Sequence, residues 1–77
     1  MTLKIISTED VLFEGEVTAV HFPGKMGSFT VLRNHATMVA ALDEGTVSYE
    51  SAEGDGDMPI RGGLVDVDNN VISVCVY

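Results

Sequence analysis

Apolar residues occur along this chain in short runs, separated every few positions by glycine, proline or acidic residues. Runs this short do not reach the length of ordinary helices and are typical of β-strands. Ser28 to Leu32 alternates most clearly, with Phe29 and Val31 on one side and Ser28 and Thr30 on the other. The regular turn spacing predicts an all-β fold, a two-sheet antiparallel β-sandwich or flattened barrel of eight to ten short strands.

The same pattern predicts further strands in Leu3–Ser7, Val17–Phe22, Thr46–Glu50, Leu64–Val67 and Val71–Tyr77. Asp68-Asn69-Asn70 lies between the last two and indicates a tight hairpin, because Asn and Asp tolerate left-handed backbone conformations. Ala36–Leu42 is ambiguous, since alanine and methionine favour helix, but its shortness and its β neighbours favour a strand. Ser51–Asp57 is interpreted as a flexible acidic hairpin tip.

Eight apolar residues are expected inside the sandwich: Ile5, Val17, Phe29, Val31, Val47, Leu64, Val67 and Val74. Cys75 lies between Val74 and Val76, so we expect its thiol to be buried and unreactive.

The length of 77 residues predicts a single domain over residues 1–77. Cys75 is the only cysteine, so no intramolecular disulfide can form, and a reducing cytoplasm fits best. The first residues carry neither a basic region nor a long apolar run, so no signal peptide or membrane insertion is expected.

Twelve acidic residues against four basic ones give a net charge of −8. No Lys or Arg occurs between Asn34 and Ile60. This negative charge repels phosphate groups, which makes nucleic acids and anionic membranes poor partners. Solubility is the simplest reason for this charge, and a basic protein partner is compatible with it.

Residues that could carry chemistry are sparse. His21 and His35 lack the spacing of metal-ligand pairs, and no serine or cysteine is placed for nucleophilic catalysis. The segments Gly24–Gly27 and Arg61–Gly63 do not match a phosphate-binding loop. Gly62 and Gly63 instead predict a bulge or a close approach of two backbones. We therefore expect no enzyme activity, metal, cofactor or small-molecule substrate.

Lys25 and Met26 are predicted at an exposed loop tip between two glycines. Methionine adapts to irregular partner surfaces, so this tip is a candidate docking loop.

Three segments occur in an order typical of one family: Leu12–Val17, Gly27–Ala36 and Gly62–Val67. Together they resemble the amino-terminal β-sandwich domain of the epsilon subunit of bacterial F-type ATP synthases, from about Leu3 to Val76. Family members commonly have Pro-Gly before the histidine and another proline after the alanine, where this chain has Arg33-Asn34 and Thr37. Asn34 can adopt a left-handed conformation, so the turn is expected to persist.

The resemblance implies a non-catalytic rotor subunit of the central stalk of a proton-translocating ATP synthase. Such a subunit couples the membrane c-ring to the gamma subunit by rigid contact, at the cytoplasmic face of the bacterial inner membrane. The c-ring interface would comprise Pro23, Gly24, Lys25, Met26, Gly27 and Ser28. The gamma interface would comprise Ser7, His35, Ala36, Thr37, Met38 and Val39.

Family members commonly continue into a helical hairpin that can inhibit ATP hydrolysis and, in some, bind ATP. The sequence stops at Tyr77, either because the natural chain is short or because it is a fragment, so we expect no carboxy-terminal helical domain in it. A small ligand- or carbohydrate-binding β module is the alternative function. The absence of tryptophan argues against this alternative. A metal-dependent hydrolase is a third hypothesis, and the absence of metal-ligand spacing argues against it.

Overall fold

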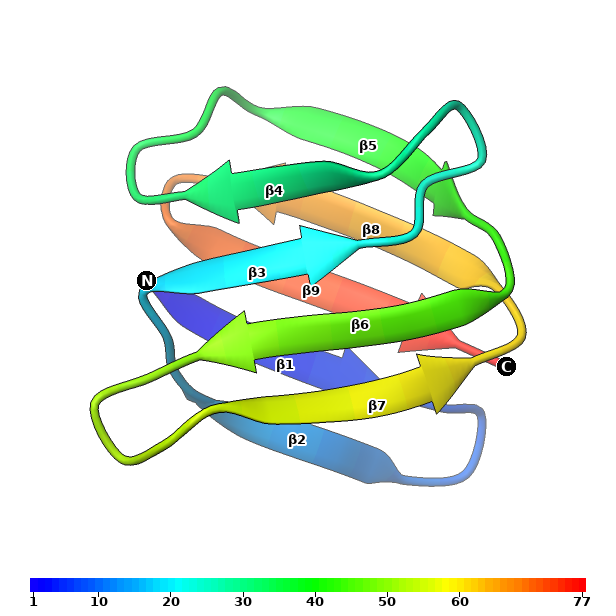
Figure 1. The fold of residues 1–77 in the computed structure, drawn as a ribbon, viewed down its shortest axis with the longest axis horizontal. Coiled ribbons are helices and arrows are strands. Elements are labelled where there is room, and N and C mark those ends of the chain that lie inside the picture. Colours follow the sequence, from blue (N-terminus) through cyan, green and yellow to red (C-terminus); the bar gives the residue numbers. More distant parts are fainter.

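The computed structural model describes all of residues 1–77 and contains nine β-strands and no helix (Figure 1). The strands are β1 (Thr2–Ile6), β2 (Val11–Glu16), β3 (Ala19–Phe22), β4 (Phe29–Leu32), β5 (Met38–Leu42), β6 (Gly45–Glu50), β7 (Gly56–Ile60), β8 (Gly63–Asp68) and β9 (Val71–Val76). No helix is present that could cross a membrane.

The strands form two sheets packed face to face, which confirms the predicted sandwich (Figure 1). The five-stranded sheet has the order β2-β1-β9-β8-β5, and the four-stranded sheet has the order β4-β3-β6-β7. All neighbouring strands are antiparallel except β1 and β9, which pair in parallel. The first and last strands of the chain therefore lie side by side inside one sheet.

The core lies between the sheets and follows the two-residue period of each strand. Fourteen buried apolar residues form one cluster, and Phe29 is half-buried against it. Six of the residues expected inside are buried: Ile5, Val17, Val31, Val47, Val67 and Val74. The prediction was wrong for Leu64, which is 56% exposed. Val65 and Val67 point inward, and alternation directs Leu64 to the opposite face.

The prediction that Cys75 is buried was also wrong, because Cys75 is exposed. Val74 and Val76 are both buried, so the residue between them points outward from the same strand. Cys75 pairs in register with Leu64 on β8 and with Ile6 on β1. These residues share the outer face of the five-stranded sheet.

Left-handed asparagines shape two of the connections. Asn69 and Asn70 have φ angles of 50° and 62° and form the predicted hairpin between β8 and β9. Asn34 has a φ of 63° after β4, as expected for the turn that replaces the family's proline-glycine pair. Its backbone N–H donates to Asn70 Oδ1 at 2.7 Å, and Asn70 Nδ2 donates to Asn34 Oδ1 at 3.0 Å.

Gly63 lies where two backbones approach closely at the start of β8. A Cβ atom at this position would overlap the carbonyl oxygen of Cys75 and would lie 3.1 Å from the Cα atom of Val76. Its φ of 157° is a second reason for glycine. Gly62 is buried beside Tyr77, whose N–H donates to the Gly62 carbonyl at 3.1 Å.

Candidate functional site

The connections between strands gather at two opposite ends of the sandwich. Strands β1, β9 and β5 run in the same direction within the five-stranded sheet, so the segments that follow them lie together (Figure 1). We call this the Met26 end, made up of residues 7–10, 23–28, 43–44, 61–62 and 77. The opposite Asn34 end is made up of residues 17–18, 33–37, 51–55 and 69–70.

The candidate docking loop, Pro23–Ser28, forms a tight turn at the Met26 end. The Gly27 N–H donates to the Gly24 carbonyl at 3.0 Å, which places Lys25 and Met26 at the centre of the turn. Gly27 has a φ of 123°, a conformation that other residues rarely adopt. Met26 is fully exposed, so the turn presents an apolar side chain directly to solvent.

The base of this loop is fixed to the end of β5. The Lys25 N–H donates to the Ala41 carbonyl at 3.0 Å, and the Asp43 N–H donates to the Pro23 carbonyl at 2.7 Å. These bonds connect the end of β3, in the four-stranded sheet, to β5 in the five-stranded sheet. The loop therefore has a rigid base and an exposed tip.

The residues predicted to meet gamma do not form one cluster. His35 to Val39 begin at the Asn34 end and continue along β5, whereas Ser7 lies at the Met26 end. Ser7 shapes its own turn, since its N–H donates to the Asp10 carbonyl at 2.8 Å and its hydroxyl accepts the Asp10 N–H at 3.2 Å. The structure thus places Ser7 at the opposite end of the sandwich from His35, Ala36 and Thr37.

Local bonds hold the segment between β4 and β5. The His35 N–H donates to the Leu32 carbonyl at 3.1 Å, and its Nδ1 atom lies 2.8 Å from the Ala36 carbonyl oxygen. The Thr37 hydroxyl donates to Asp68 at 3.2 Å. Met38 is half-buried between the sheets, and Val39 is 71% exposed on the outer face.

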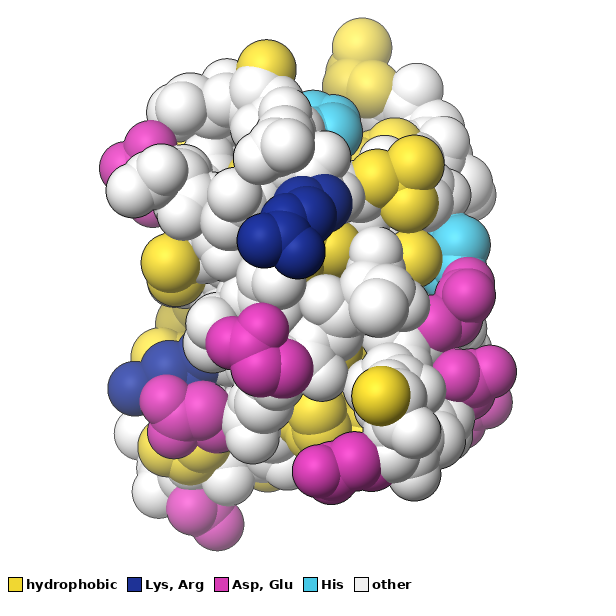
Figure 2. All heavy atoms as spheres, turned by 90° about the vertical axis from the view of Figure 1, so that its left-hand side faces the viewer, with side chains coloured by type: hydrophobic (Ala, Val, Ile, Leu, Met, Phe, Trp, Pro, Cys, Tyr) yellow, Lys and Arg dark blue, Asp and Glu magenta, His cyan; other side chains and the backbone are white.

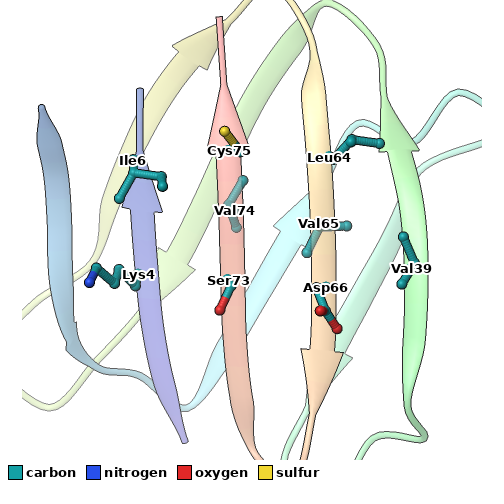
Figure 3. Close-up of a pocket in the computed structure, with 9 residues that line it drawn as sticks. All are labelled: Lys4, Ile6, Val39, Leu64, Val65, Asp66, Ser73, Val74 and Cys75. Carbon is teal, nitrogen blue, oxygen red and sulfur yellow. The ribbon is translucent and has the colours of Figure 1, made fainter. Parts of the chain in front are cut away.

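A shallow hollow of about 480 Å³ lies on the outer face of the five-stranded sheet (Figure 3). Its floor is the small side chains of Ser73 and Cys75 on β9, and longer side chains from β1 and β8 flank it. One row across the strands is apolar, with Ile6, Cys75 and Leu64, and the next row contains Lys4, Ser73, Asp66 and Val39. Sequence reasoning missed this surface because it assigned Leu64 and Cys75 to the core.

The outer face of the four-stranded sheet is polar. His21 Nδ1 lies 2.9 Å from the Thr30 hydroxyl, and His21 Nε2 lies 2.8 Å from Glu50 Oε2. Both ring nitrogens therefore contact neighbouring strands. No three His, Cys, Asp or Glu side chains gather in a way that could hold a metal ion.

Figure 2 views the molecule from the Asn34 end, where several acidic side chains are visible around one basic group near the centre and a second basic group lies towards one side. Glu16 borders this end and accepts a hydrogen bond from the Thr2 hydroxyl at 2.8 Å. That bond, together with the N-terminal ammonium group at 3.2 Å, lowers the pKa of Glu16 below its ordinary value. The Glu16 carboxylate thus links β2 to the start of β1, and its partners are the Thr2 hydroxyl and the N-terminal ammonium group.

These observations define a small β-sandwich with an exposed loop at one end and a partly apolar outer face on its five-stranded sheet. The sequence matches the family described as ATP synthase, Delta/Epsilon chain, beta-sandwich domain over residues 1–77, and the chain belongs to that family. It is 34% identical to the ATP synthase epsilon chain of Leptospira borgpetersenii over 96% of its own length and 58% of that protein. It is 41% identical to the epsilon chain of Sulfurovum over 88% of its own length and 54% of that protein. The chain thus spans a little over half the length of these relatives.

Solved structures share the fold. A chain of the Euglena gracilis mitochondrial ATP synthase superposes with a TM-score of 0.88 at 23% identity, covering 96% of this chain and 48% of that one. A chain from the central stalk and c-ring of the Tetrahymena thermophila mitochondrial ATP synthase superposes with a TM-score of 0.84 at 13% identity, covering 99% of this chain and 62% of that one. At these identities, the likeness establishes the sandwich fold.

Proposed function

We propose that this chain is a central-stalk rotor component of an F-type, proton-translocating ATP synthase that couples the c-ring to the gamma subunit by rigid contact. The observation that carries the proposal is the match of all 77 residues to the epsilon-type sandwich family. The role is non-catalytic, and the chain belongs peripherally to a membrane-associated complex at the cytoplasmic face of the bacterial inner membrane.

The mechanical properties of the fold suit this role. Torque passes between two partners only through a connector that does not deform. Of the 45 backbone hydrogen bonds in the chain, 34 lie within the strands of the two packed sheets, and the loop Pro23–Ser28 is bonded to β5 at its base. A load applied at Met26 would therefore reach both sheets through backbone bonds.

The two proposed interfaces involve separate parts of the molecule. Pro23 to Ser28 at the Met26 end would contact the c-ring, and the fully exposed Met26 would be its apolar anchor. His35 to Val39 would contact gamma along the edge of the five-stranded sheet. Ser7 lies at the Met26 end, so it would contact gamma only where that subunit approaches the ring.

Met26→Glu tests the c-ring contact. The side chain is fully exposed, so the substitution should change the free energy of unfolding of the isolated domain by at most about 0.5 kcal/mol. At an interface, the same carboxylate would be buried without a partner, which is costly. We expect a normal thermal melt of the domain together with reduced proton pumping in reconstituted membranes.

Leu32→Glu is the matched control, because Leu32 is also an exposed apolar residue but lies on β4 towards the Asn34 end. It should leave pumping close to the wild-type rate. Normal pumping by Met26→Glu would exclude the loop as a docking element. A collapsed melt of that variant would show that the loop is structural.

The alternative of a ligand- or carbohydrate-binding module gains no support. Such sites commonly expose several aromatic rings, and Tyr77 is the only aromatic residue among the large exposed apolar side chains. Phe13 and Tyr49 pack on each other, with ring centroids 4.2 Å apart, against the core.

A further inference from the structure

The two sheets have four edge strands, and they differ in how they are protected. An unprotected edge presents free backbone N–H and C=O groups that another strand can pair with. Strand β2 carries Glu14 and Glu16 and has an irregular register, and β7 carries Asp57 and Pro59. Strand β4 has only four residues and is followed directly by Arg33. These are the usual devices that prevent edge pairing.

Strand β5 has none of these devices. Its sequence, Met-Val-Ala-Ala-Leu, contains no charge and no proline, and its register with β8 is regular. The loop Pro23–Ser28 covers only its end, through bonds to Ala41 and Asp43. The part of the edge around Val39 is open.

The direction of the free backbone groups follows from the bonds at that end. The Ala41 carbonyl accepts the Lys25 N–H, so the backbone groups of Ala41 point away from β8. Backbone direction alternates along an antiparallel strand, so those of Val39 point away from β8 as well. Val39 makes no backbone bond outside the regular strand ladders. Its N–H and C=O, and the N–H of Ala41, are therefore available to a further strand.

The side chains beside this edge indicate the chemistry of that strand. Val39 and Leu64 are 71% and 56% exposed on the same outer face. Asp66 is paired in register with Val39, and neither Asp66 nor Asp68 forms an ion pair. A strand that fits here would have an apolar side chain against Val39 and a Lys or Arg flanking it.

We propose that an extended, partly basic segment of the gamma subunit adds to the five-stranded sheet as a sixth strand alongside β5. This inference rests on the proposed function for the identity of the partner, and it specifies how the partner is held. Main-chain hydrogen bonds to Val39 and Ala41 would supply affinity, and side chains beside Val39 and Asp66 would supply specificity. A helix could cover the apolar side chains but could not pair with the free backbone groups, because its own are used internally.

Residue-resolved amide exchange of the 77-residue chain, alone and saturated with recombinant gamma subunit, tests this arrangement. The Val39 amide should exchange rapidly in the free chain and at least about tenfold more slowly in the complex, because a new hydrogen bond protects it. The Met38 and Ala40 amides already face β8, so their exchange should change little. Unchanged exchange at Val39 in a saturated complex would overturn the inference.

Val39→Pro provides a second measurement, because proline removes the N–H at an edge position where its ring is tolerated. Binding to gamma should weaken by about tenfold or more. Val39→Thr keeps both the N–H and the β-branched shape and should bind within about threefold of the wild type. If Val39→Pro does not fold, the exchange experiment on the wild-type chain still shows whether a strand of the partner pairs with β5.

The possible failures have different meanings. A wild-type chain that does not bind gamma would refute the proposed function and, with it, the strand addition. Binding without protection of Val39 would refute only the strand addition. Concentration-dependent protection of Val39 in the chain alone, with a dimer in analytical ultracentrifugation, would show that a second copy occupies the edge and would overturn the assignment to gamma.

Discussion

Asn34 and Asn70 illustrate how single residues determine the Asn34 end. Both have left-handed backbone conformations, and they exchange two hydrogen bonds although 36 positions separate them in the sequence. The conformation of each residue was predictable, because asparagine is among the few residue types that tolerate it. Their pairing was not predictable, since it depends on how the two sheets bring distant turns together.

Replacing Asn34 separates these two contributions. Asn34→Ala should lower the free energy of unfolding by about 2 kcal/mol, because alanine is strained at positive φ and the bond from Asn70 is lost. Asn34→Gly loses the bond alone and should cost about 1 kcal/mol. Urea unfolding of both variants measures the difference. Equal losses would show that backbone strain is unimportant at this turn.

Glu16 makes a pH-dependent contribution of predictable sign. Its pKa is lowered in the folded chain, first by the bond from Thr2, so its stabilisation is present above the unfolded-state pKa and is lost as the pH falls through the folded-state value. Thr2→Val should move the pKa of Glu16 back towards its ordinary value. The stability difference between Thr2→Val and wild type should shrink in acid.

Carboxyl titration by NMR, with urea unfolding at neutral and acidic pH, measures both effects. Thr46→Val is the control, because Thr46 is exposed and its hydroxyl makes no hydrogen bond within the chain. It should leave the titration of Glu16 unchanged. An unaltered Glu16 titration in Thr2→Val would contradict the assigned cause.

At the scale of elements, most strands were predictable from period-two patterns. Which side chains of each strand point into the core was harder to predict. Alternation places Leu64 on the face opposite Val65 and Val67, so Leu64 and Val67 could not both lie inside, yet it does not say which face is inside. The register of β8 with both β9 and β5 decides this in favour of Val65. Strand β7 was missed because Pro59 and the preceding acids are typical of loops, and an edge strand is where a sheet tolerates them.

The start of β8 depends on a glycine at position 63. Gly63→Ala should destabilise the chain by about 3 kcal/mol or more, because the added methyl would overlap the Cys75 backbone. Gly54→Ala is the matched control, since Gly54 also has a positive φ, 129°, but no atom within 4 Å of the added carbon. It should cost about 1 kcal/mol. Equal decreases in the melting temperatures of the two variants would show that conformational strain, and not the contact with Cys75, makes Gly63 necessary.

At the scale of the whole molecule, charge is poorly balanced. The net charge is −8, and only two ion pairs form, one of them through His21. Repulsion among the remaining carboxylates opposes the compact state. Composition alone predicted this imbalance, whereas the free edge of β5 required the arrangement of the sheets to be known.

Salt should therefore stabilise the chain by screening this repulsion. Raising sodium chloride from about 20 mM to about 500 mM shortens the screening length several-fold and should raise the melting temperature by about 4–8 °C, which corresponds to about 1 kcal/mol. The double variant Asp55→Asn, Asp57→Asn should show a smaller increase. A melting temperature that falls with salt would mean that attractive pairs dominate.

The position of β9 has a consequence for biosynthesis. Strand β9 is the last of these nine strands to be translated, yet it lies between β1 and β8 at the centre of its sheet. Until residues 71–76 leave the ribosome, the β1–β2 hairpin and the β5–β8 pair have no strand to join them. The nascent sandwich would thus expose apolar core residues of the five-stranded sheet until β9 emerges, and a chaperone that shields apolar strands would act before that point.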